Sequence, residues 1–90
     1  MHKIYEHGKF IVLEGHNQYI VVNKSKKFES GHTHINNYNT ARWLIRLSEG
    51  LIVPKNISIY LVESLIRINN NPDYLRQLTG LKQSKLARKD

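Results

Sequence analysis

Two apolar runs separated by only three residues constrain the fold of this 90-residue chain more than any other feature. They read KFIVLE (9–14) and QYIVVN (18–23), and both are rich in the β-branched and aromatic residues that favour strands. Gly15-His16-Asn17 lies between them, and glycine and asparagine accept the positive φ that a tight turn requires. We therefore predict a β-hairpin.

Further strands are predicted on both sides of this hairpin. KIYE (3–6) precedes Gly8, and FESGHTHI (28–35) follows the polar segment KSKK, which is typical of a solvated turn. Together these segments predict an antiparallel meander of three to four strands over residues 1–35.

Three short helices are predicted over residues 37–80. In the first, Asn37 or Asn39 is the expected N-cap and Gly50 the residue just after the end, with Trp43 packed where the helix meets the sheet. The segment ISIYLVESLIRIN (57–69) is apolar around most of its circumference; its β-branched residues also suit a strand, but its length favours a helix.

The third predicted helix has a start signal and a stop signal in the sequence. Asn71 is the expected N-cap, Pro72 the first helical position and Gly80 the stop. Residues 81–90 then form a basic tail, either a weak helix or a mobile arm. The whole chain is thus expected to be a single α+β domain over residues 1–90.

The hairpin strands carry apolar side chains on both faces, because Phe10 and Val12 alternate with Ile11 and Leu13. A sheet of this kind needs a cover on each side. Three short helices do not obviously supply both covers, so a second copy of the chain or another protein is an open possibility.

The charge balance points to an anionic partner. Fourteen Lys and Arg against seven Asp and Glu give a net charge of +7. Nucleic acid is the first expectation, with DNA preferred over RNA, and no membrane association is expected. A sheet face laid in the major groove is one possible geometry, similar in layout to the arm-binding domains of tyrosine integrases, and a helix-turn-helix made by 57–69 and 72–80 is another.

Two histidines one residue apart, His32 and His34, raise the question of a metal site. If Ile35 faces the core, both imidazoles point away from it, because side chains alternate along a strand. GHTH (31–34) resembles the last metal-binding motif of calcineurin-like metallophosphoesterases, but the other motifs of that family are absent. We assign no metal and no cofactor, and expect the histidines to contact a partner instead.

Nothing in the sequence indicates catalysis. There is no nucleophile elbow, no phosphate-binding glycine loop and no obvious carboxylate pair, and a chain of this length builds only one small core. The absence of cysteine and of a signal peptide favours the cytoplasm. Frequent Asn, Ile and Lys residues are typical of AT-rich bacteria and their phages or mobile elements.

The function predicted from the sequence is a small basic nucleic-acid-binding regulatory protein without catalytic activity. The alternative is an interaction module that binds a larger nucleic-acid enzyme, either as a monomer or as a homodimer. The candidate binding residues are Lys24, Lys26, Lys27, His32, His34, Asn37, Arg42, Arg46, Lys82, Lys85, Arg88 and Lys89.

Overall fold

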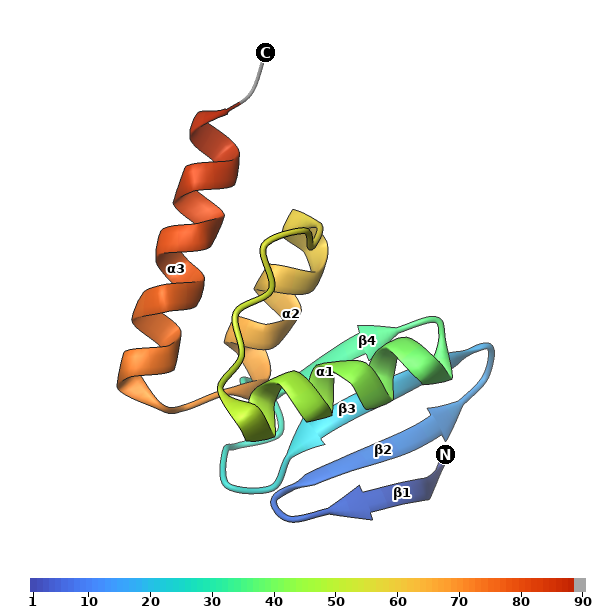
Figure 1. Ribbon diagram of the computed structural model, residues 1–90. Coiled ribbons are helices and arrows are strands. Elements are labelled where there is room, and N and C mark those ends of the chain that lie inside the picture. The colour runs from blue at the N-terminus through green and yellow to red at the C-terminus, as the bar shows by residue number, and fades with distance from the viewer. Residues whose placement is uncertain (89–90) are drawn as a thin grey trace.

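A four-stranded antiparallel sheet and three helices make up the described residues, 1–88, of this computed structural model (Figure 1). The order is β1 (His2–His7), β2 (Phe10–Gly15), β3 (Gln18–Asn23), β4 (His32–Ile35), α1 (Tyr38–Gly50), α2 (Ile59–Ile68) and α3 (Pro72–Ala87). The strands lie side by side in sequence order, β1-β2-β3-β4. The predicted α+β class, with a sheet followed by helices, is therefore confirmed.

The predicted hairpin is formed by β2 and β3. Their register pairs Gly15 with Gln18, so His16 and Asn17 make a two-residue turn in which Asn17 adopts a φ of 60°. Asparagine tolerates this left-handed conformation better than most residues, which explains its place here. The register sends Phe10, Val12 and Val21 to one face of the sheet and Ile11, Leu13 and Val22 to the other.

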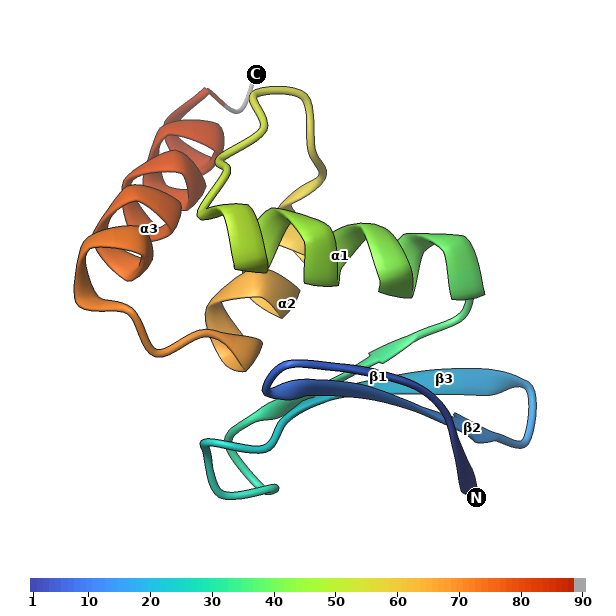
Figure 2. The same cartoon turned by 60° about the horizontal axis from the view of Figure 1, so that its bottom comes forward.

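All three helices lie on the first of these faces, which we call the inner face (Figure 2). The core forms there between the sheet and the helices, and its members are Phe10, Val12, Val21, Ile35, Ala41, Leu44, Ile45, Leu47, Ile57, Val62, Leu65, Ile68, Tyr74 and Leu78. Trp43 packs against this core and is half-buried. No helix covers the other face, the outer face, and in residues 1–88 no helix has the length and apolar character to cross a bilayer.

The first helix begins where predicted and ends one residue later. Asn37 is the N-cap, and its side-chain oxygen accepts a hydrogen bond from the Thr40 amide at 2.9 Å. Gly50, expected just beyond the helix, is its last residue, and Leu51 takes the left-handed position with a φ of 54°. The Ile52 amide then donates to the Leu47 carbonyl at 2.9 Å, which closes a Schellman-type end around Leu51.

The second predicted helix is confirmed despite its β-branched residues. Ser58 is its N-cap and accepts from the Leu61 amide at 3.2 Å. Val62, Leu65 and Ile68 are buried in the core. On the same helix Ser64 accepts a buried hydrogen bond from the Thr33 hydroxyl at 2.8 Å, which ties α2 directly to β4. Tertiary packing thus outweighs the local strand preference of this segment.

The expected end of the third helix at Gly80 is wrong. Asn71 and Pro72 start α3 as predicted, but the helix continues to Ala87. Gly80 does not adopt a positive φ, and a Cβ atom built there would meet nothing within 4 Å. Leu81, which follows Gly80, packs against the core, and this burial stabilises the helix beyond the glycine despite its low helix propensity.

Both edge strands of the sheet, β1 and β4, have features that disfavour pairing with a further strand. In β1 the register slips between Lys3 and Tyr5, which leaves Ile4 as the extra residue of a bulge. Along β4, Tyr60 donates its hydroxyl to the carbonyl of His34, and Arg67 Nε donates to the carbonyl of His32 at 2.9 Å. Side chains of α2 therefore occupy acceptors that an additional strand would need.

Candidate nucleic-acid interface

The predicted binding residues fall in three separate places. Lys24, Lys26, Lys27, His32 and His34 lie in the turn 24–31 and on β4. Asn37, Arg42 and Arg46 belong to the start and body of α1, and Lys82, Lys85 and Arg88 to the second half of α3 and its C-cap. Lys89 lies outside the described residues.

The three lysines of the turn have different roles. Lys24 forms an ion pair with Glu6, which also pairs with Lys3. Lys26 points inward, where its Nζ donates to the backbone carbonyls of Arg67 at 2.8 Å and Asn69 at 3.1 Å. Burial lowers the pKa of the Lys26 ammonium, and the nearby Arg67 lowers it further.

Lys27 is exposed and forms no ion pair within residues 1–88. Of the three lysines in this turn, it is the one whose charge remains available to a partner.

His32 and His34 lie on the outer face, as the phase of Ile35 predicts. Thr33 and Ile35 are buried, whereas His32 is half-buried and His34 exposed. Each histidine ends a row of side chains across the sheet, and these rows are Glu6-Ile11-Val22-His32 and Lys3-Leu13-Ile20-His34.

The predicted neighbourhood of these histidines is only partly formed, because α1 packs on the inner face. Arg42 lies there over the ring of Tyr5, with its guanidinium carbon 3.8 Å from the ring centroid, and it donates to the Tyr38 hydroxyl at 3.2 Å. The hydrogen bond from Arg42 to Tyr38 raises the pKa of the guanidinium. The side-chain oxygen of Asn37 accepts the N-cap hydrogen bond of α1. Of the three predicted binding residues at α1, namely Asn37, Arg42 and Arg46, only Arg46 is an exposed cation.

The third group contributes to a basic groove at the end of the molecule away from the sheet. This groove, defined by Lys55, Asn56, Ile57, Ser58, Ile59, Lys85 and Arg88, has a volume of about 330 Å³. It is lined by the loop that leads into α2 and by the last turns of α3, which both lie at the end of the molecule away from the sheet (Figure 1). The Lys85 ammonium stands 3.5 Å from the Lys55 carbonyl, so the loop and the helix are in contact.

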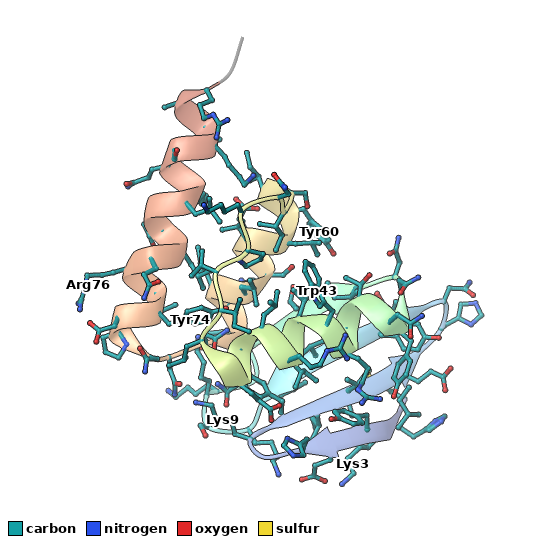
Figure 3. All side chains as sticks on the ribbon, in the orientation of Figure 1. Lys3, Lys9, Trp43, Tyr60, Tyr74 and Arg76 are labelled. Carbon is teal, nitrogen blue, oxygen red and sulfur yellow. The ribbon has the colours of Figure 1, made fainter. Side chains whose placement is uncertain are left out.

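Electrostatics distinguish the basic groove from the rest of the surface. None of its lining residues is acidic, and within residues 1–88 Lys55, Lys85 and Arg88 take part in no ion pair. Elsewhere in residues 1–88 four cations have acidic partners, among them Lys82, which pairs with Glu63 at 3.1 Å, and Arg76, which projects away from α3 in Figure 3 and pairs with Asp73. Lys27 and Arg46 are also without an ion pair, but they do not line this groove. Three cations in one groove produce a local positive potential, which favours the approach of an anion.

No metal site emerges around the two histidines. Residues 1–88 contain no group of three or more His, Asp or Glu side chains placed to hold a metal ion. His32 Nδ1 instead contacts the Phe28 carbonyl oxygen, and His34 Nδ1 contacts the Gln18 side-chain oxygen at 3.0 Å. The imidazoles therefore have local hydrogen-bond partners on the outer face.

Sequence reasoning missed Lys55 as a member of the site. It is an isolated cation in a short loop, and only the packing of that loop against α3 brings it beside Lys85 and Arg88. No local pattern signals such a contact, because the two segments are about thirty residues apart. Phe28 was also missed as a surface residue, although an aromatic side chain within a polar turn is a usable signal.

Comparison with known proteins found no matching family model, no matching curated protein and no matching solved structure, so the candidate interface is defined by geometry and charge alone.

Proposed function

We propose that this protein binds nucleic acid through the phosphate backbone at the basic groove, and that it is a small regulatory protein without catalytic activity. The observation that carries the proposal is the convergence of Lys55, Lys85 and Arg88 on one groove, whose lining within residues 1–88 contains no acidic side chain. Clustered Lys and Arg on one surface are the electrostatic footprint of a nucleic-acid-binding protein.

The shape of the basic groove also supports a polymeric anion. It is a shallow depression at the tip of the helical layer, open to a strand that runs across it, instead of an enclosed cavity for a small molecule. The α2 helix begins there, so its positive dipole end adds to the three side-chain charges. Phosphate contacts alone do not distinguish DNA from RNA, and we take DNA, the first expectation from the sequence, as the candidate to test.

Fluorescence anisotropy with a labelled duplex at several salt concentrations tests the proposal. Binding should weaken steeply with salt, and the double variant Lys85→Gln/Arg88→Gln should lower the slope of log K against log salt by about 1 to 2. The matched control is Lys9→Gln/Arg76→Gln, which removes the same charge from exposed positions that are not candidate binding residues. Equal losses in the two double variants, or no binding at low salt, would overturn the proposed groove.

A further inference from the structure

An aromatic ring is exposed on the side of the sheet that no helix covers. Phe28 is 48% exposed and belongs to the turn between β3 and β4, which extends below the sheet in Figure 2, away from the helices. Its ring lies parallel to the imidazole of His32, with centroids 4.1 Å apart and an angle of 3° between the planes. His34 meets His32 edge-on at 5.1 Å. These three rings form what we call the aromatic platform.

The platform is held in place by the backbone around it. His32 Nδ1 contacts the carbonyl oxygen of Phe28, so ring and main chain are both fixed relative to β4. Gly31 allows the close turn: a Cβ atom there would lie 2.6 Å from Lys26 Cβ and 3.0 Å from the Lys27 carbonyl oxygen. The Lys26 ammonium anchors the same turn to the end of α2. A ring fixed in this way loses little conformational entropy when a ligand binds.

One side of the platform remains open. Within residues 1–88, His32 is the one ring stacked on Phe28, and nearly half of the Phe28 surface faces solvent. The exposed side of the Phe28 ring can therefore extend the stack by one more flat group. Nucleic-acid bases are such groups, and they stack on aromatic side chains whatever their sequence.

The charges around the platform select an anionic ligand. Lys27 directly precedes Phe28 in the chain and Glu29 directly follows it, and both are exposed. Lys24 and Lys3 both pair with the carboxylate of Glu6, so these five residues carry a net positive charge. Phosphates on either side of a stacked base would meet this positive surplus.

The remaining outer face offers little to a protein partner. Its central residues Ile20 and Val22 are already 3% and 7% exposed, and Ile11 and Leu13 are half-buried. Stable protein interfaces bury on the order of 1,000 Å² or more, with a well-packed apolar centre. In β2, β3, β4 and the turn before β4, Phe28 is the one exposed large hydrophobic residue, which suits a single base better than a protein surface.

We propose that the aromatic platform binds an unpaired base of a single-stranded nucleic acid, stacked on Phe28, with Lys27 at a neighbouring phosphate. This inference rests on the proposed function, but its residues are separate from Lys55, Lys85 and Arg88. The protein would then contact a nucleic acid at two surfaces, a phosphate site at the tip of the helices and a base site on the sheet.

Binding of two strands that differ only in their bases tests the platform. The probes are a short labelled oligothymidylate and an abasic strand of the same length and charge. Wild-type protein should prefer the strand with bases by about tenfold, because stacking on one aromatic ring accounts for such a factor. Phe28→Leu should abolish the preference, Phe28→Trp should retain it, and Lys85→Gln/Arg88→Gln should weaken both strands while leaving their ratio unchanged. Circular dichroism and thermal melting confirm that each variant folds.

The results separate this inference from the proposed function. Salt-dependent binding with equal affinity for the two strands would overturn the platform and leave the basic groove intact. Loss of the preference in Lys85→Gln/Arg88→Gln but not in Phe28→Leu would also overturn it. A wild-type dimer in sedimentation experiments that Phe28→Leu converts to monomer would show that a second copy occupies the outer face, and the base site would then be abandoned.

Discussion

Lys26 extends from the turn after β3 to the carboxyl end of α2, where its Nζ donates to the backbone carbonyl of Arg67 at 2.8 Å. The last carbonyls of a helix have no partner within the helix and carry the negative end of its dipole, so a cation there is stabilising. A residue that the sequence suggested as a contact for nucleic acid is therefore engaged in holding a helix against a turn.

Replacing Lys26 should accordingly affect stability and spare nucleic-acid binding. Lys26→Met keeps the aliphatic stem but loses both hydrogen bonds, and we expect it to lower the free energy of unfolding by about 1 kcal/mol. The neighbouring change Lys27→Met, at an exposed side chain, should shift stability by less than about 0.5 kcal/mol. Urea denaturation compares the two. A larger loss in Lys27→Met than in Lys26→Met would contradict the assigned role.

Acid should weaken the contact that Glu6 makes across the outer face. The hydrogen bond from Lys24, followed by that from Lys3, lowers the pKa of the Glu6 carboxyl from 4.5 to about 2. Because the folded-state pKa is below the unfolded value, the stabilisation is complete above about pH 4.5 and fades as the pH falls toward 2. Carbon-detected NMR titration of the Glu6 carboxyl measures the pKa directly. In Lys24→Gln it should move upward, and an unchanged value would show that Lys24 is not the main cause.

Tyr74 should make stability depend on alkaline pH. Its buried hydroxyl donates to the Ile52 carbonyl at 2.7 Å, and burial raises its pKa to about 12. The folded-state pKa exceeds the unfolded value of about 10, so this contribution is complete below about pH 10 and is lost as the pH rises toward 12. Tyr74→Phe should cost about 1 kcal/mol at neutral pH. It should also remove the latest step in the absorbance titration of tyrosinate; a titration curve that keeps that step would assign it to another tyrosine.

Leu51 offers a stabilising substitution. A leucine in the left-handed region is strained by about 1 kcal/mol, and its side chain is 48% exposed, so little packing is lost when it is removed. Leu51→Gly should raise the free energy of unfolding by about 0.5 kcal/mol after the added freedom of the unfolded chain is subtracted. Leu51→Ala is the control, since alanine keeps the strain. If the alanine variant gained as much as the glycine variant, backbone strain would not be the reason.

Much of the fold follows from local signals in the sequence. Asn17 at the hairpin turn, Asn37 before α1 and Asn71-Pro72 before α3 each supply a backbone conformation or a hydrogen bond that few other residues provide. Gly80 misled the prediction because a glycine ends a helix only when the backbone there turns left-handed, and continued burial of Leu81 keeps it right-handed.

The candidate site was less predictable, because it depends on which face of the sheet the helices cover. Alternation along β4 correctly placed His32 and His34 on one face, but it did not reveal that Arg42 lies on the other. Similarly, Lys26 and Lys27 are adjacent in the sequence, and only the position of α2 decides that the first is engaged and the second exposed.

The contacts of Tyr60 and Arg67 with the carbonyls of β4 affect the tendency of the newly synthesised chain to aggregate. FIVL and YIVV are segments of the kind that join intermolecular sheets, and in the finished protein they lie in β2 and β3, between two shielded edges. The bulge of β1 lies within the N-terminal pair of strands, whereas the contacts that protect β4 come from α2, which follows the whole sheet in the chain and is synthesised after it. Before α2 packs against the sheet, the β4 edge can pair with a strand of another chain. We therefore expect α2 to reduce aggregation in addition to contributing to the core.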